Sequence, residues 1–326
     1  MTQSWTIPAL IALAAPPTCL ALYTVWVCYQ FLPTIMRVFE ETPLFVPPNE
    51  PPDPGAENVR FQTSDGLWLQ GSWFPPYMGP CRGTIVFCHE YLSNRWSCRP
   101  YAEPLRESGF QVFAFDFRNH GESQSLPGYD PMQWATAHEV VDLRAALAQV
   151  RGRVGSQDHR IGLLGISRGG SAGILAAALD PSVRAVVTDG AFPTHFTQFS
   201  YMIRWAGIYA GHLHIYQLTP SWYYSILCWI ARFLGGRRHG CRFPRVERAV
   251  RKISPRPLLM IHGEKDSYIV EEIARKLFAH AAEPKEFWLV PGAKHNGAIQ
   301  VAGEEYARRL VAVFQDQEGS DALGGA

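Results

Sequence analysis

The sequence predicts an α/β fold in which helices cover both faces of a mostly parallel sheet, with an antiparallel hairpin at its start. Two observations support this prediction. From residue 83 onward, short apolar runs alternate with helical patterns, as in parallel strands joined by crossover helices. Residues 59–74 instead alternate apolar and polar positions around a Ser-Asp-Gly turn, which is typical of a hairpin.

The elements after the hairpin follow in regular order. Apolar runs of strand length are each followed by a segment with helical spacing or small residues, and glycines stand where several of these helices end. We expect strands at 83–89, 110–117, 160–166, 183–192, 256–263 and 286–292, and helices at 99–109, 138–152, 169–180, 270–281 and 298–313.

One segment interrupts this order. Residues 193–255 separate two predicted strands and are too numerous for a plain crossover. The segment is rich in aromatic residues and ends in a run of arginines, so we expect a helical cap insertion at about 193–252, over the carboxyl edge of the sheet. Two interpretations of its aromatic residues stay open: they line a site for an apolar substrate, or they form the cap's own core. The arginines either contact anionic lipid headgroups or are solvated.

The N-terminal region predicts a membrane anchor. Residues 5–36 carry no charged side chain, and about 20 apolar residues suffice to span a bilayer. A removable signal peptide would have basic residues before its apolar run, so a retained single-pass anchor at 1–36 is favoured over a cleaved signal or a soluble packed helix. Arg37, the nearest flanking cation, favours a cytoplasmic position for the rest of the chain.

A linker and a tail flank the predicted domain. Six prolines fall between residues 43 and 54, which indicates a semi-rigid spacer at 37–58. The folded domain then extends over 59–316, and residues 317–326 are expected to form a flexible tail.

Composition excludes several classes of partner. The net charge of +1 gives no basis for binding nucleic acid. The seven cysteines include no Cys-x-x-Cys pair, so we predict neither a zinc site nor a disulfide framework, and we expect no cofactor. His212 and His214 lie close together but lack neighbouring acids or cysteines, and we expect no metal there.

Ser167 is the predicted nucleophile. It lies in the stretch GISRG, between an apolar strand and a helix of small residues. A nucleophilic serine at such a place sits on a sharp turn that brings backbone segments together, so the residues two before and two after it must lack a Cβ. Gly165 and Gly169 satisfy this requirement. A serine that only capped the helix would not explain glycine on both sides.

A serine hydroxyl needs a base, and the base needs an acid to orient it. Asp266 and His295 each follow a predicted strand, so both belong at the same edge of the sheet as Ser167, in the chain order Ser, Asp, His. We therefore predict His295 as general base and Asp266 as its orienting acid. Asp189 and Glu264 are the alternative acids.

From residue 59 to the final helix, the chain resembles serine hydrolases of the α/β-hydrolase superfamily, in particular membrane-anchored or cap-bearing esterases and acyl hydrolases. The resemblance rests on the GISRG stretch, on HGEKD at 262–266, on PGAKH at 291–295 and on DFRNHGES at 116–123. The last stretch matches the family's D-x-R-x-H-G-x-S run, whose residues brace a loop, so His120 is not predicted to be catalytic.

The resemblance also implies an oxyanion hole, a pair of backbone N–H groups that hold the negative oxygen of the transition state. Relatives have glycine after the histidine that ends the third strand, whereas this chain has Glu90 there. By position the donors are the N–H groups of Tyr91 and Arg168. We expect the Glu90 side chain to point away from the site and to pair with Arg95.

The predicted reaction is acyl transfer to water on a small-molecule or lipid-like ester, without a metal. Three alternatives remain: a serine peptidase of the same fold, an acyltransferase or thioesterase, and a non-catalytic module tethered to the membrane.

Overall fold

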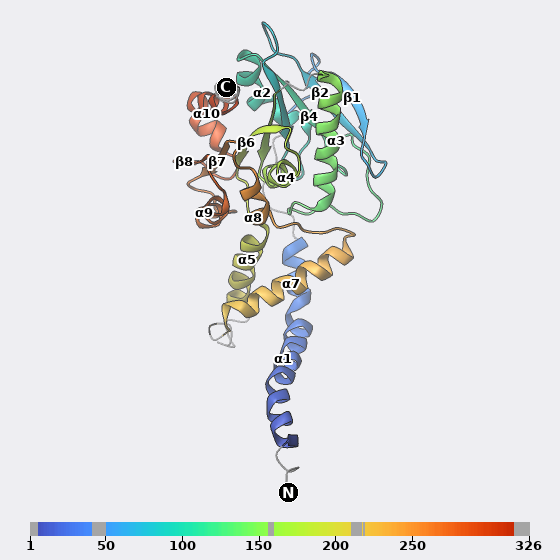
Figure 1. Ribbon diagram of the computed structural model, residues 1–326, viewed down its shortest axis with the longest axis vertical. Coiled ribbons are helices and arrows are strands. Elements are labelled where there is room, and N and C mark those ends of the chain that lie inside the picture. Colours follow the sequence, from blue (N-terminus) through green and yellow to red (C-terminus); the bar gives the residue numbers. More distant parts are fainter. Residues whose placement is uncertain (1–5, 41–49, 156–159, 210–216, 218, 316–326) are drawn as a thin grey trace, which may run out of the picture.

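The computed structural model describes residues 6–40, 50–155, 160–209, 217 and 219–315. Within them lies one eight-stranded sheet with the order β1-β2-β4-β3-β5-β6-β7-β8 (Figure 1). The strands are β1 (Glu57–Gln62), β2 (Trp68–Phe74), β3 (Gly83–Cys88), β4 (Phe110–Phe115), β5 (Ile161–Ile166), β6 (Val183–Asp189), β7 (Leu258–Gly263) and β8 (Lys285–Val290).

The sheet is mixed, as predicted. β1 pairs with β2, and β2 with β4, in antiparallel fashion. All other pairs, from β4 across to β8, are parallel. The carboxyl ends of β3 and β5 to β8 therefore meet at one edge, where ligands bind in open α/β sheets. The predicted α/β fold with an N-terminal hairpin is confirmed.

Helices cover both faces of the sheet. Side chains of α3, α4, α8 and α9 pack into one hydrophobic cluster with the strands, and those of α2 and α10 pack into another. The described helices are α1 (Thr6–Glu40), η1 (Arg95–Cys98), α2 (Arg99–Glu107), α3 (Ala137–Val154), α4 (Arg168–Ala177), α5 (Thr194–Tyr209), α7 (Ser221–Arg238), α8 (Val246–Ala249), η3 (Val250–Lys252), α9 (Glu271–His280) and α10 (Ala298–Gln315).

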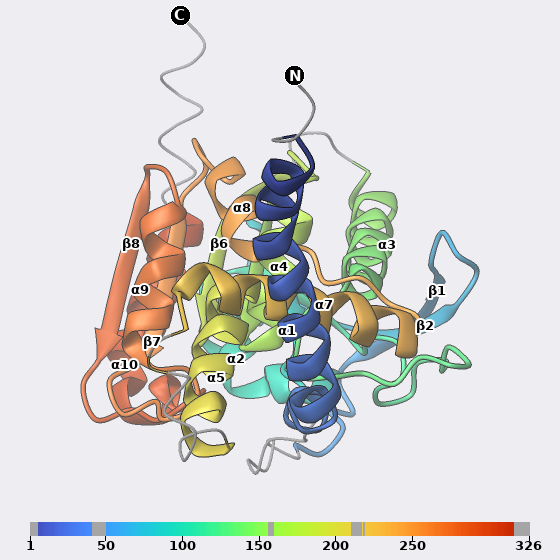
Figure 2. The same cartoon turned by 90° about the horizontal axis from the view of Figure 1, so that it is seen from below.

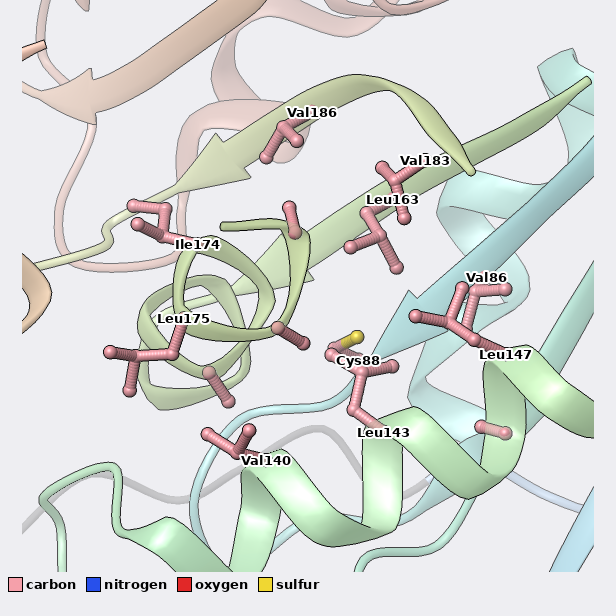
Figure 3. Close-up of a cluster of buried hydrophobic side chains, with 14 of the residues drawn as sticks. Val86, Cys88, Val140, Leu143, Leu147, Leu163, Ile174, Leu175, Val183 and Val186 are labelled. Atoms are coloured by element: carbon pink, nitrogen blue, oxygen red, sulfur yellow. The ribbon is translucent and has the colours of Figure 1, made fainter. Parts of the chain in front are cut away.

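Helix α3 shows how sequence positions a helix on the sheet. Thr136 and Glu139 form a capping box at its start, and Gly155, with φ 64°, ends it. Leu143 and Leu147, one turn apart, are fully buried against strand residues such as Val86 (Figure 3). The cap and the one-sided apolar spacing together place this helix.

The predicted cap segment is helical. It contains α5, α7, α8 and η3, and α5 and α7 project away from the sheet next to α1 (Figures 1 and 2). Residues 210–216, which include His212 and His214, lie outside the described residues. The buried tyrosines Tyr223 and Tyr224 belong to a cluster shared by α1, α5 and α7, so part of the aromatic content is the cap's own core.

Helix α1 extends four residues beyond the predicted anchor, to Glu40. Its stretch Ala15–Arg37 is long and apolar enough to cross a bilayer. β1 begins at Glu57, so the last two residues of the linker predicted at 37–58 belong to this strand. Residues 41–49 of that linker and the predicted tail 317–326 lie outside the described residues.

We expect Leu143→Ala to lower the free energy of unfolding by about 2–5 kcal/mol, because it leaves a cavity in the cluster of Figure 3. Denaturant titration of the full chain in detergent micelles measures this. Arg144→Ala, at an exposed position on the same helix, is the control and should change stability by less than about 0.5 kcal/mol. Equal effects of the two variants would contradict the packing described here.

Candidate active site

Three polar side chains meet at the carboxyl edge of the sheet. Ser167 follows β5, Asp266 lies in the loop after β7, and His295 follows β8. The Oγ atom of Ser167 is 2.8 Å from Nε2 of His295. The Nδ1 atom of His295 is 2.6 Å from Oδ2 of Asp266. An alcohol, an imidazole and a carboxylate thus form one chain of hydrogen bonds.

The surroundings of Asp266 fix the direction of these bonds. Its Oδ1 atom accepts hydrogen bonds from the backbone N–H groups of Tyr268 and Ile269, at 2.9 and 2.8 Å. The other oxygen, Oδ2, is left to accept from Nδ1–H of His295. With its proton on Nδ1, the imidazole presents the Nε2 lone pair to the hydroxyl of Ser167.

Ser167 occupies a strained backbone position. Its φ of 52° and ψ of −116° lie where few residues other than glycine are found, and its N–H donates to the carbonyl of Asp189 at 2.7 Å. A Cβ on Gly165 would lie 2.5 Å from Cα of Gly170, and one on Gly169 would lie 2.2 Å from the carbonyl oxygen of Cys88. The sharp turn therefore needs both glycines.

Comparison with known proteins decides the family. A family model described as alpha/beta hydrolase fold matches residues 83–214. The uncharacterized protein YfhR of Escherichia coli O157:H7 is 32% identical over 268 residues, which are 80% of this chain and 81% of YfhR. This chain belongs to the α/β hydrolases. The predicted resemblance is confirmed, and membership supports a hydrolase activity.

Two further similarities bear on this α/β hydrolase. The structure of the Pyrococcus furiosus esterase Pf2001 superposes with a TM-score of 0.60 at 22% identity, covering 86% of this chain and all of the esterase chain. The thiohydrolase aneE of Aspergillus aculeatus is 33% identical over 134 residues, which are 40% of each chain. The first similarity shows the shared fold.

The two predicted oxyanion donors of this hydrolase come from neighbouring segments. Arg168 is the first residue of α4, where backbone N–H groups have no partner within the helix. Tyr91 lies in the loop after β3, and the guanidinium carbon of Arg168 is 5.4 Å from the centre of the Tyr91 ring. The loop after β3 and the start of α4 therefore pack together beside Ser167.

His89 controls the orientation of that loop. Its Nε2 atom accepts from the N–H of Phe117 at 3.1 Å, so Nδ1 carries the proton and donates to the carbonyl of Glu90 at 2.7 Å. Burial lowers the pKa of His89 to about 3, which keeps the ring neutral. The carbonyl of Glu90 and the N–H of Tyr91 belong to one trans peptide and point in opposite directions, so this bond also orients the predicted donor. Sequence analysis missed this role of His89.

The predicted pairing of Glu90 with Arg95 is wrong. Glu90 is buried, and its carboxyl accepts from the hydroxyl of Ser97 at 3.2 Å. Arg95 instead forms ion pairs with Asp116 and Glu122, because Asp116 lies buried within reach of both its backbone N–H and its guanidinium. Burial raises the pKa of Glu90, which favours the neutral acid and so avoids a negative charge in the loop that carries the predicted oxyanion donor Tyr91.

The Arg168 side chain connects the turn at Ser167 to α3 and the segment before it. Sequence analysis missed this role as well. Its guanidinium is fully buried in an ion pair with Glu139, and it donates to the carbonyl of Trp134 at 3.2 Å and to the hydroxyl of Tyr129 at 3.3 Å. Glu139 is also the capping-box residue of α3. The spacing of Thr136 and Glu139 in the sequence is typical of a capping box, but no sequence pattern predicts that Glu139 also pairs with Arg168.

Asp266, rather than either alternative acid, is the hydrogen-bond partner of Nδ1 of His295. Glu264 accepts from the backbone N–H of Gly292 at 2.8 Å. Asp189 is fully buried, with the hydroxyl of Tyr306 near its carboxyl group. His120 contacts Arg168 and the backbone of Arg118, and burial lowers its pKa, in keeping with the structural role that we expected for it.

We expect Gly169→Ala to lower the melting temperature sharply, because its Cβ would collide with the carbonyl oxygen of Cys88. Gly173→Ala, one turn further along α4, meets nothing within 4 Å and is the matched control. In a helix interior alanine is favoured over glycine, so this control should be neutral or stabilising. Thermal unfolding followed by circular dichroism measures both, and equal tolerance would contradict the close approach at Gly169.

Asp189→Asn should stabilise the protein increasingly as pH rises. Burial raises the pKa of Asp189 to about 7, above its ordinary value near 4. Between these values the native state holds a proton that the unfolded chain has lost, so this carboxyl lowers stability as pH rises toward 7. The gain in melting temperature of the variant should grow from pH 4 to pH 7 and then level off. A gain independent of pH would contradict the raised pKa of this buried carboxyl, and Asp130→Asn at an exposed position is the control.

Proposed function

We propose that this α/β hydrolase is a serine hydrolase that cleaves carboxylic esters through Ser167, His295 and Asp266. One observation carries the proposal: the hydroxyl, the imidazole and the carboxylate are joined at 2.8 and 2.6 Å, on a turn that holds the serine in a strained conformation. A serine in a purely structural role would need neither the base nor the strain.

In the proposed mechanism, His295 takes the proton of Ser167 as Oγ attacks the carbonyl carbon of the ester. The N–H groups of Tyr91 and Arg168 hold the oxygen that becomes negative. His295 then gives the proton to the leaving alcohol, and an acyl group remains on Ser167. Water, deprotonated by His295, attacks this acyl-enzyme, releases the carboxylic acid and restores the hydroxyl of Ser167.

The structure of the cap insertion favours an apolar substrate. Ser167 is only 3% exposed, so the reacting atoms are shielded from bulk water. The hydroxyl of Tyr201 on α5 donates to the carbonyl of Tyr268, two residues beyond Asp266, and its ring lies 5.9 Å from that of Trp134. We infer that the insertion at 193–252 encloses the acyl part of the substrate, which is a small-molecule or lipid-like ester.

The named relatives favour acyl chemistry with two kinds of leaving group. Pf2001 is described as an esterase, and aneE as a thiohydrolase. The same serine mechanism cleaves both esters and thioesters, so the thioester is the second candidate substrate. Peptide amides, with a poorer leaving group, are the third.

We also propose that α1 anchors the hydrolase in a membrane as a single span. The apolar stretch Ala15–Arg37 supports this, and most of its side chains are exposed in the structure. The cation Arg37 and the seven free cysteines favour the cytoplasmic side for the catalytic domain.

Labelling with a fluorophosphonate tests the nucleophile. The full chain in detergent should be labelled, and Ser167→Ala should not be labelled at all, whereas Ser125→Ala, at an exposed position, should be labelled like the wild type. His295→Ala should lower kcat by about 10⁴-fold or more. Labelling of the Ser167→Ala variant would refute the proposed mechanism.

A panel of ester chain lengths, matched thioesters and peptide amides tests the substrate class. We expect kcat/KM to rise with acyl chain length and to be lowest for the amides. Preference for the amides would replace the esterase proposal with a peptidase.

A further inference from the structure

Helix α7 has an exposed apolar stripe. Trp222, Ile226, Trp229 and Phe233 follow one another at intervals of four, three and four residues, so they lie on one side of the helix. Their exposed fractions are 53%, 38%, 60% and 52%. The opposite side of α7 is buried in the cap core. A surface helix normally presents polar residues at such positions. Among the described residues, the guanidinium of Arg237 lies over the ring of Phe233, at 5.9 Å from its centre, but the four side chains stay largely exposed.

Helix α1 lies beside α7 in both views (Figures 1 and 2). The ring of Tyr223 lies 5.7 Å from that of Tyr23, and its hydroxyl donates to Thr24 at 3.2 Å. At this level α1 exposes further apolar side chains, among them Val25 at 65%. The stripe therefore adjoins the segment of the chain that is apolar enough to cross a bilayer.

An arginine-lined hollow adjoins the stripe. Trp229 and Phe233 form part of its wall, and its volume is about 950 Å³. Asp65, the one carboxylate among the described residues of the wall, already pairs with Arg118. Five arginines line the hollow: Arg232, Arg237, Arg242, Arg245 and Arg248.

Three of these arginines are available for a ligand. Arg237, Arg242 and Arg248 are exposed, and none of them forms an ion pair with a carboxylate of the described residues. Arg232 instead donates to Gln198, and Arg245 lies 3.9 Å from Glu247. Guanidinium groups bind phosphate oxygens in pairs of parallel hydrogen bonds. The hollow is therefore suited to a phosphate group.

We propose that α7 lies in the surface of a bilayer, with its stripe among the acyl chains and the arginine hollow around the headgroup phosphate of an anionic phospholipid. Aromatic side chains next to arginines are typical of helices at this boundary. A groove for an apolar protein segment would not require three arginines without a carboxylate partner among the described residues at its end. The adjoining apolar helix α1 would bring the stripe to the membrane. This inference is independent of the proposed esterase activity.

The depth of the stripe can be measured with spin labels. In a background with Cys19, Cys28 and Cys81 replaced by serine, labels are placed at Trp229→Cys and, as control, at Ala148→Cys, an exposed position on α3. The full chain is reconstituted into vesicles of phosphatidylcholine with phosphatidylglycerol. We expect the label at 229 to be relaxed more by oxygen, which concentrates in acyl chains, than by a water-soluble nickel chelate, and the control to show the reverse.

Two outcomes would overturn the proposal. A label at 229 that is relaxed mainly by the nickel chelate would show that the stripe faces water. A label protected from both reagents would show that a protein surface, such as a second copy of the chain, covers it. A label at Val25→Cys reports insertion of α1 separately, so failure of the anchor and failure of the stripe are distinguished.

Charge reversal tests the headgroup site. We expect the depth of the label at 229 to increase when phosphatidylglycerol is added to phosphatidylcholine, and Arg237→Glu/Arg242→Glu/Arg248→Glu to abolish this increase. A control variant changes the net charge by the same amount at exposed positions outside the hollow: Arg144→Glu/Arg184→Glu/Lys276→Glu. In this control the label at 229 should still move deeper when phosphatidylglycerol is added. An equal loss in both triple variants would overturn the headgroup site, and a circular dichroism spectrum and melting temperature like those of the wild type show that each variant is folded.

Discussion

The hydrogen bond between Ser167 and His295 is the interaction on which the rest of the candidate site depends. It joins residues 128 positions apart, and it can form only because β5 and β8 run parallel and end at the same edge of the sheet. Asp266 lies in the loop after β7, the strand that pairs with β8, and its carboxylate is bonded to the other nitrogen of the His295 ring. The topology thus provides the proximity, and the loops after the strands provide the orientation.

The turn that carries Ser167 is strained, and its surroundings hold it in place. A residue in such a conformation costs about 1–3 kcal/mol and persists only where neighbouring contacts enforce it. Here the N–H of Ser167 is bonded to the carbonyl of Asp189, and the next residue, Arg168, is held by its buried ion pair with Glu139 at the start of α3. Removing one partner of such a pair leaves an uncompensated buried charge. The turn that carries Ser167 is therefore coupled to the packing of α3.

Much of the fold could be predicted from sequence because its signals are local. The hairpin, the alternating strands and the glycines around Ser167 each follow from short patterns, and the chain order indicated which strand ends carry Asp266 and His295. The partners of Glu90 and Arg95 could not be predicted, because ion pairing across a domain depends on distances that no local pattern encodes. For the same reason, the hydrogen bond between His89 and the carbonyl of Glu90 could not be predicted from the sequence.

The most direct test of the central claim locates a covalent adduct on the wild-type protein. Trypsin releases Ile161–Arg168, a peptide with the sequence IGLLGISR in which Ser167 is the one hydroxyl side chain. After reaction with diisopropyl fluorophosphate, mass spectrometry should find the phosphoryl adduct on this peptide, and His295→Ala should prevent its formation. An unmodified IGLLGISR peptide, or an adduct on another serine, would contradict the assignment of Ser167 as the nucleophile.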